Sequence, residues 1–150
     1  MSKAFTKVYI HYVWATKKRQ NVLTKKVIEP LKTHIREYCQ QKGIYVYEVN
    51  GFLNHLHLLI DLPATKSVAE VINLIKGESS HWINSTNLLP GKFAWQIRYS
   101  AFSVSASKKK VVANYIRNQE SHHRKKSFIE ELKLFYEQYG LDPKGLSEMP

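Results

Sequence analysis

Two histidines separated by one residue form the first candidate site. His55 and His57 lie in an apolar, β-branched stretch, residues 52–62, that is typical of a strand. Side chains two apart on a strand point to the same face, so both imidazoles can converge on one divalent ion while Leu56 faces the core. The alternative is a pair of histidines on a solvated sheet face, because a His-x-His spacing arises easily in a chain with 7 histidines.

Tyr115 and Gln119 form the second candidate site. They are four residues apart in a helical pattern and would share one face of the helix. A phenol oxygen can attack a phosphate, and an amide oxygen can complete a metal site. The spacing alone predicts little, because the chain has 9 tyrosines and most buried tyrosines are packing residues with a bonded hydroxyl.

Basic residues gather on both sides of the candidate nucleophile. The chain has 23 Lys plus Arg against 12 Asp plus Glu, a net charge of +11. This balance favours a polyanionic partner, most often nucleic acid, although a basic surface can also serve solubility. The predicted DNA-binding residues are Lys17, Lys18, Arg19, Lys108, Lys109, Lys110, Arg117 and Arg124.

The elements that would position these residues can be predicted for the first half of the chain. Residues 5–15 read as a strand, and residues 17–19 as a basic loop. A helix is expected over residues 24–40, where Pro30 predicts either a late start or a kink. Residues 44–49 and 52–62 should then form a hairpin that turns at Asn50-Gly51.

The second half of the chain predicts three helices and a strand. Ser67 and Glu70 make a capping box for a helix over residues 68–82, and residues 84–92 are loop. A strand over residues 95–104 precedes a helix over residues 108–121 that Ser107 would cap. Ser127 and Glu130 would cap a last helix that ends near Tyr139.

This order of elements predicts an α+β fold with a ferredoxin-like antiparallel sheet, two helices on one face, and further C-terminal helices. We expect one domain over residues 1–150, with its core at about 5–139 and a loosely held tail at 140–150. The single cysteine, Cys39, excludes a disulfide framework and reads as a packing residue. The longest apolar run, residues 56–60, is too short for a membrane span, so we expect a cytoplasmic protein.

Several stretches together resemble the HUH single-tyrosine transposases of small insertion sequences, the IS200-like family that transposes as single-stranded DNA. The resemblance covers residues 5–139 and its motifs occur in family order. The stretches that carry it are Trp14-Ala-Thr-Lys-Lys-Arg19, Asn54-His-Leu-His-Leu58, Leu74-Ile-Lys-Gly-Glu-Ser-Ser80, Ala101-Phe-Ser-Val-Ser105, Tyr115-Ile-Arg-Asn-Gln119 with His122 and His123, and Ser127-Phe-Ile-Glu-Glu131. The sequence departs from the family at Arg98-Tyr99-Ser100, where a Gly-Tyr-Gly-like run is frequent.

The resemblance implies an HUH transposase fold and a set of residue roles. His55, His57 and Gln119 would be the metal ligands, for magnesium or manganese, and Tyr115 the nucleophile. Two imidazoles favour tight binding of manganese, whereas magnesium prefers oxygen ligands. The enzyme would cleave hairpin-bearing single-stranded DNA at insertion-sequence ends, form a 5′-phosphotyrosine link, release a 3′ hydroxyl and then rejoin strands. The implied assembly is a homodimer, acting in the prokaryotic cytoplasm and on the nucleoid when DNA-bound, without a small-molecule cofactor.

Three other functions remain open at this stage. A non-catalytic ferredoxin-like nucleic-acid-binding module would share the order of elements, and residues 98–102 faintly resemble the aromatic strand motif of RNA-recognition domains. An HUH replication or mobilisation nickase would usually carry additional domains. A metal hydrolase that uses His55 and His57 would form no covalent adduct.

Overall fold

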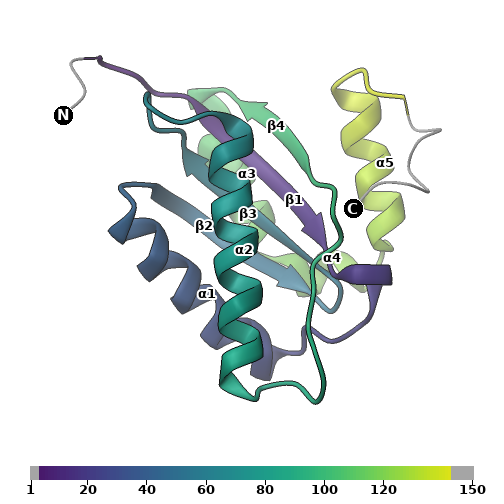
Figure 1. Cartoon of the computed structure of the whole chain (residues 1–150). Helices are drawn as coiled ribbons and strands as arrows, with labels where there is room; N and C mark the ends of the chain where they lie inside the picture. The colour runs from purple at the N-terminus through teal and green to yellow at the C-terminus, as the bar shows by residue number, and fades with distance from the viewer. Residues whose placement is uncertain (1–3, 143–150) are drawn as a thin grey trace.

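The structure, a computed structural model, describes residues 4–142, so most of the predicted tail lies outside the described residues. A four-stranded antiparallel sheet runs through the middle of the molecule in the order β2-β3-β1-β4 (Figure 1). The strands are β1 (Tyr9–Ala15), β2 (Tyr45–Phe52), β3 (His55–Asp61) and β4 (Ser100–Val104). The predicted ferredoxin-like sheet is confirmed.

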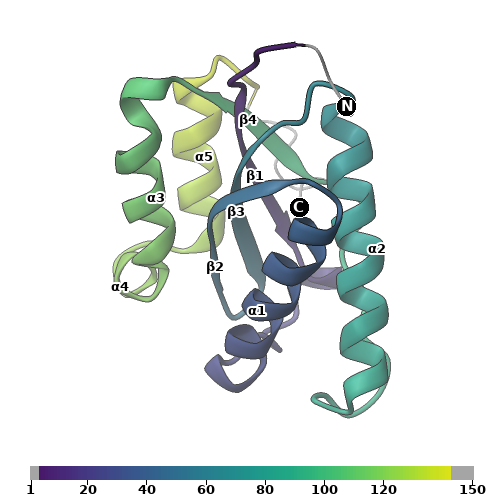
Figure 2. The ribbon, with the colours of Figure 1, turned by 90° about the vertical axis from the view of Figure 1, so that its left-hand side faces the viewer.

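Helices cover both faces of the sheet. α1 (Lys25–Gln41) and α2 (Val68–Thr86) lie on one face, whereas α3 (Lys109–Arg117), α4 (Gln119–His123) and α5 (Phe128–Gln138) lie on the other (Figure 2). Because the central strands β1 and β3 are covered from both sides, nearly every residue in them is buried. Leu56 and Leu58 therefore face α1 and α2, and the histidines between and beside them face α3 to α5.

The hairpin turn is not where the sequence predicts it. Asn50 and Gly51 lie inside β2, opposite His57 and Leu56, and the chain reverses at Leu53-Asn54, where Leu53 has a φ of 53°. Gly51 is needed for another reason: a Cβ at this position would collide with the carbonyl oxygen of His55. The Asn-Gly pair therefore reflects a close approach of two strands, and the turn prediction was wrong.

The helix predicted over residues 108–121 is divided in two. α3 ends at Arg117, and α4 begins after Asn118, whose φ and ψ are −100° and 31°. Asn118 Nδ2 donates to the Asn114 carbonyl oxygen, which satisfies an end group of α3. Ser107 lies in a short 3-10 helix, η2 (Ala106–Lys108), and does not cap α3.

Other boundaries differ by a few residues. α1 starts at Lys25 and continues through Pro30, so the proline does not mark a late start. β1 and β4 begin later than predicted, and the chain before β4 makes an isolated bridge between Trp95 and Thr16. The capping box of Ser67 and Glu70 is confirmed, and Ser127 accepts from the Glu130 N–H at the start of α5. None of the described helices is long and apolar enough to cross a membrane.

Candidate metal and tyrosine centre

The paired histidines of β3 are enclosed between the sheet and the C-terminal helices. The side chains of His55 and His57 are both fully buried, so the solvated-face alternative does not hold. The ring of His55 stacks on Phe128 of α5 at a centroid distance of 4.0 Å. Buried imidazoles need bonded partners, and those of the two Nε2 atoms come from α4 and α5.

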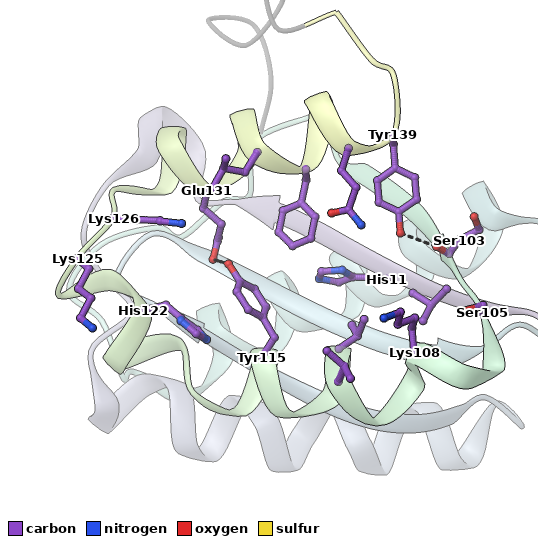
Figure 3. Close-up of a pocket in the computed structure, with 16 residues that line it drawn as sticks. His11, Ser103, Ser105, Lys108, Tyr115, His122, Lys125, Lys126, Glu131 and Tyr139 are labelled. Carbon is purple, nitrogen blue, oxygen red and sulfur yellow. Dashed lines mark hydrogen bonds between the residues drawn. The ribbon is translucent and has the colours of Figure 1, made fainter.

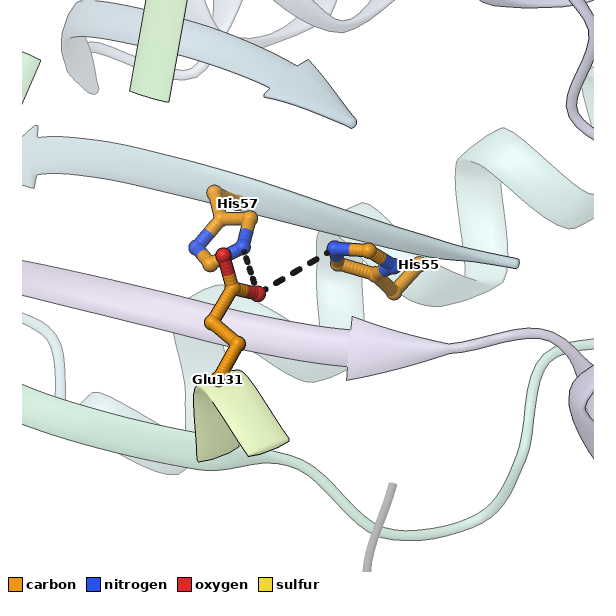
Figure 4. A group of neighbouring side chains, drawn as sticks. All are labelled: His55, His57 and Glu131. Carbon is orange, nitrogen blue, oxygen red and sulfur yellow. Dashed lines mark hydrogen bonds and ion pairs between the residues drawn. The ribbon is translucent and has the colours of Figure 1, made fainter. Parts of the chain in front are cut away.

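Glu131 on α5 is the principal partner of both histidines (Figure 4). Its Oε1 lies 2.8 Å from His57 Nε2 and 3.3 Å from His55 Nε2. One donor atom from each of the three residues lies within 4.8 Å of the other two. Glu131 was not predicted from the sequence, although a signal exists there. It lies three residues after Phe128 and four before Phe135, and so falls on the apolar face of its helix.

Gln119 joins the same cluster from the first position of α4. Its side chain is fully buried, with Oε1 at 3.0 Å from His55 Nε2 and at 3.1 Å from His123 Nε2. Its Nε2 donates to Glu131 Oε2 at 3.3 Å. The structure thus brings the three predicted ligands together, and Glu131 and His123 lie in contact with them.

Tyr115 reaches the cluster from α3. Its hydroxyl donates to Glu131 Oε2, and its ring stacks on His122 with a centroid distance of 4.3 Å (Figure 3). Burial and the negative charge of Glu131 raise the pKa of the Tyr115 phenol well above its ordinary value. The surroundings of this hydroxyl therefore favour its protonated form.

The charges within the cluster are set by burial and by proximity. Burial lowers the pKa of His55 to about 4, which keeps this imidazole neutral. Burial alone would raise the pKa of Glu131, but the charge of His57 and hydrogen bonds from His123, His55 and His57 outweigh it and hold the pKa well below its usual range. The site therefore contains an anionic carboxylate beside the neutral imidazole of His55.

His11 on β1 lies behind His57, and it was not predicted from the sequence either. Its Nε2 lies 2.8 Å from His57 Nδ1, and the two rings stack at 5.0 Å. Burial lowers the pKa of His11 well below its ordinary value. The contact occupies Nδ1 of His57 and leaves Nε2 facing Glu131, which fixes the ring orientation at the cluster.

The helix that carries Tyr115 is fastened to β2. Asn50 Nδ2 donates to the Arg117 carbonyl oxygen at 2.9 Å, and the Arg117 guanidinium pairs with Glu48 at 2.9 Å. Glu48 also pairs with Arg36 of α1 at 3.0 Å. Arg117, which was predicted to bind DNA, is therefore engaged in an ion pair within the protein.

The other predicted DNA-binding residues lie in three places. Lys17, Lys18 and Arg19 form a 3-10 turn, η1 (Lys17–Arg19), which only Thr16 separates from Ala15, the β1 residue that pairs with His55. Lys109 sits over the rings of Tyr9 and Tyr47, while Arg124 lies 3.6 Å from Glu120. Lys108 and Lys110 are exposed at the start of α3. Their contacts with DNA stay a prediction.

The donor set of the cluster fits a divalent cation. Two imidazole nitrogens, a carboxylate oxygen and an amide oxygen converge, and each is already positioned by a second contact to the protein. Mixed nitrogen and oxygen ligands suit manganese and other first-row divalent ions, and also accommodate magnesium. The described geometry thus supports a metal-binding group of His55, His57 and Glu131, with Gln119 beside it.

Comparison with known proteins identifies relatives of the same kind. A family model described as "Transposase IS200 like" matches residues 4–119. The ISDra2 transposase TnpA of Deinococcus radiodurans is 26% identical over 114 residues, which cover 73% of this chain and 81% of that protein. The transposase for insertion sequence element IS200 of Salmonella typhimurium is 27% identical over 70 residues, 47% of this chain and 46% of that protein.

Two solved structures share the fold. A Deinococcus radiodurans protein assigned as a transposase superposes with a TM-score of 0.64 at 26% identity, covering 79% of this chain and 95% of its own. A REP-associated tyrosine transposase, solved bound to a REP hairpin, superposes with a TM-score of 0.59 at 15% identity over 82% of this chain and 73% of its own. The second likeness concerns the fold alone. With the family model matching most of its length, the chain belongs to the IS200-like family of tyrosine transposases.

Proposed function

We propose that this transposase cleaves and rejoins hairpin-bearing single-stranded DNA at insertion-sequence ends, with Tyr115 as the nucleophile. One observation carries the proposal: the Tyr115 hydroxyl and the two β3 histidines are held by opposite oxygens of the same carboxylate, Glu131. A nucleic-acid-binding module without catalysis has no need of a phenol placed against such a group.

Glu131 is placed to accept the phenol proton. Its carboxylate is held anionic by its histidine neighbours, and Oε2 already receives the hydrogen bond from Tyr115. As the proton passes to Glu131, the Tyr115 oxygen attacks phosphorus and the bond from phosphorus to the 3′ oxygen breaks. The leaving 3′ oxygen takes up the proton that Glu131 received, which restores the carboxylate, and the 5′ phosphate stays esterified to Tyr115.

The ester stores the energy of the broken DNA bond. A 3′ hydroxyl from another strand can attack the same phosphorus, restore a phosphodiester and return the proton to Tyr115. A divalent cation held by His55, His57, Glu131 and Gln119 would act as a Lewis acid on the scissile phosphate, and we propose magnesium or manganese for this role.

The substrate and the assembly are inferred from relatives. The transposase of the same fold that was solved with a REP hairpin supports recognition of a hairpin. The excess of basic residues and the exposed η1 turn suit a DNA backbone. We propose a homodimer that works on DNA in the prokaryotic cytoplasm, and each subunit of it would carry a complete set of Tyr115, His55, His57 and Glu131.

The polarity of the covalent link gives a sharp test. A pool of single strands with a stable hairpin and randomised flanks is incubated with the protein and Mn²⁺ or Mg²⁺, then resolved on a denaturing gel. A 5′-phosphotyrosine predicts that 3′-labelled strands become protein-linked, whereas 5′-labelled strands give a shorter free product that terminal transferase can extend.

Matched tyrosine variants assign the nucleophile. Tyr115→Phe removes one hydroxyl and should abolish the protein-linked band, while Tyr45→Phe, at an exposed position of β2, should keep it. Sequencing the linked strands would define the target site. Adduct formation by Tyr115→Phe at the wild-type level would show that another residue is the nucleophile.

A further inference from the structure

A cavity opens beside the Tyr115 hydroxyl, between the tyrosine helix and α5. It has a volume of about 770 Å³ and extends from Glu131 and His122 at one end to β4 and η2 at the other (Figure 3). Small-molecule sites in proteins span about 300–1,000 Å³, so the space suits a ligand of nucleotide size. The mechanism above uses only the wall formed by Tyr115 and Glu131.

The two long walls of the cavity are apolar. Val111 and Val112 of α3 face Leu134 and Phe135 of α5 across it. Leu134 and Val111 are 48% and 61% exposed, so apolar surface on both walls is open to a ligand. Such walls suit the flat, apolar faces of a nucleobase, which bind to apolar and aromatic surfaces with little dependence on sequence.

The remaining lining is basic or hydrogen-bonding. Lys108 lies at the β4 end, and Lys125 and Lys126 lie near His122. Among the described residues that line the cavity, Glu131 is the only acidic one, and its carboxylate is already bonded to Tyr115 and the histidines. The cavity is therefore positive overall, as a nucleotide phosphate requires.

His122 provides a hydrogen-bonding group that is not yet used. Its ring stacks on Tyr115, and its Nε2 is buried without a hydrogen-bond partner among the described residues. A buried polar atom normally has a partner, so a ligand in this cavity is a natural candidate to supply one.

We propose that this cavity binds one unstacked nucleotide of the single-stranded substrate, the neighbour of the scissile phosphate, with its base between α3 and α5 and its phosphate toward the lysines. This inference rests on the proposed function, because the nucleotide is placed next to the scissile phosphate that Tyr115 would attack. The proposal adds that the protein unstacks one base of the single-stranded substrate before cleavage.

Binding of the four deoxynucleoside 5′-monophosphates tests the cavity directly. Saturation-transfer NMR at millimolar nucleotide, with EDTA present to exclude a contribution from metal, should show transfer from the protein to base protons. Leu134→Trp fills the cavity from a half-exposed position and should weaken binding about tenfold or more. Ile129→Trp, on the same helix but outside the cavity lining, should bind like the wild type.

Two further comparisons separate base binding from simple phosphate binding. Lys108→Ala should weaken nucleotide binding more than Lys110→Ala, which lies outside the lining. Deoxyribose 5-phosphate, which lacks a base, should displace the nucleotides poorly. The proposal is overturned if the wild type shows no transfer to base protons, if Leu134→Trp binds as tightly as the wild type, or if deoxyribose 5-phosphate competes equally well.

The adduct assay then links the cavity to cleavage. Leu134→Trp should lower the yield of protein-linked DNA at subsaturating substrate, with Ile129→Trp unaffected. Absence of any adduct in the wild type would count against the proposed function, whereas metal-independent nucleotide binding that is insensitive to Leu134→Trp would count against the cavity alone.

Discussion

The two faces of the sheet share the same strands and bury different chemistry. On the face covered by α1 and α2, β3 contributes Leu56 and Leu58 to an extended apolar core. On the face covered by α3 to α5, the alternate residues His55 and His57 meet Gln119 and Glu131. The first face supplies hydrophobic stabilisation, and the second can bury four polar groups because each of them has a partner.

The largest effect on cleavage is expected from substitution of Glu131, the carboxylate on the face covered by α3 to α5. Glu131→Gln keeps the size of the side chain but removes the proton acceptor of Tyr115, so cleavage should fall by about 10²–10⁴-fold, the range for a lost acid–base group. Single-turnover adduct formation measures this. Cleavage within a few-fold of the wild type would mean that Glu131 only packs the site.

A substitution on the apolar face should lower the stability of the protein but leave its cleavage activity unchanged. Leu58→Ala removes a fully buried side chain and should lower the free energy of unfolding by about 2–5 kcal/mol. Urea denaturation measures the loss, and adduct formation per folded molecule should be retained. A selective loss of cleavage in the folded variant would mean that the two faces are not independent.

Metal should stabilise the folded protein through the second face only. Mn²⁺ at about one hundred times its dissociation constant adds about 2.7 kcal/mol, or roughly 5–10 °C in Tm for a domain of this size. Differential scanning fluorimetry against EDTA measures the shift, which should shrink in His55→Gln and persist in Leu58→Ala. An equal shift in His55→Gln would place the ion elsewhere.

The smallest effect is expected where β2 holds the tyrosine helix. Glu48→Gln weakens the ion pair with Arg117 but leaves the hydrogen bond from Asn50 in place. Because the Arg117 side chain is 60% exposed, we expect cleavage to fall by only about threefold, as for a half-exposed pair. Double substitution with Asn50→Ala should have a larger effect than the sum of the single changes if both contacts position α3.

Much of the fold could be predicted from local patterns, because strand alternation, helical spacing and capping residues are short-range signals. The same signals gave wrong predictions where a tertiary contact determines the local structure. Asn50-Gly51 is a strong turn pair by itself, yet the approach of β3 places it inside a strand. The predicted helix around Tyr115 is interrupted at Asn118, beyond which the buried Gln119 meets His55.

The residues of the candidate site also fall into two groups, those that were predicted from the sequence and those that were not. His55, His57, Tyr115 and Gln119 were predicted, mainly through the family resemblance, and the structure brings their side chains together. Glu131 and His11 were missed, because a glutamate in the first turn of a helix and a histidine in an aromatic strand each have ordinary explanations. Only the folded arrangement places them against the histidines of β3.

Because Gly51 has only a hydrogen atom as its side chain, the edge strand β2 can pack closely against β3 beside the proposed reaction centre. A methyl group there would push β2 away from the carbonyl oxygen of His55. That displacement would carry along Glu48 and Asn50, the anchors of the tyrosine helix, and would also shift the backbone of His55, a proposed metal ligand. A laboratory that engineers this enzyme should therefore treat position 51 as part of its catalytic alignment, although it contributes no functional group.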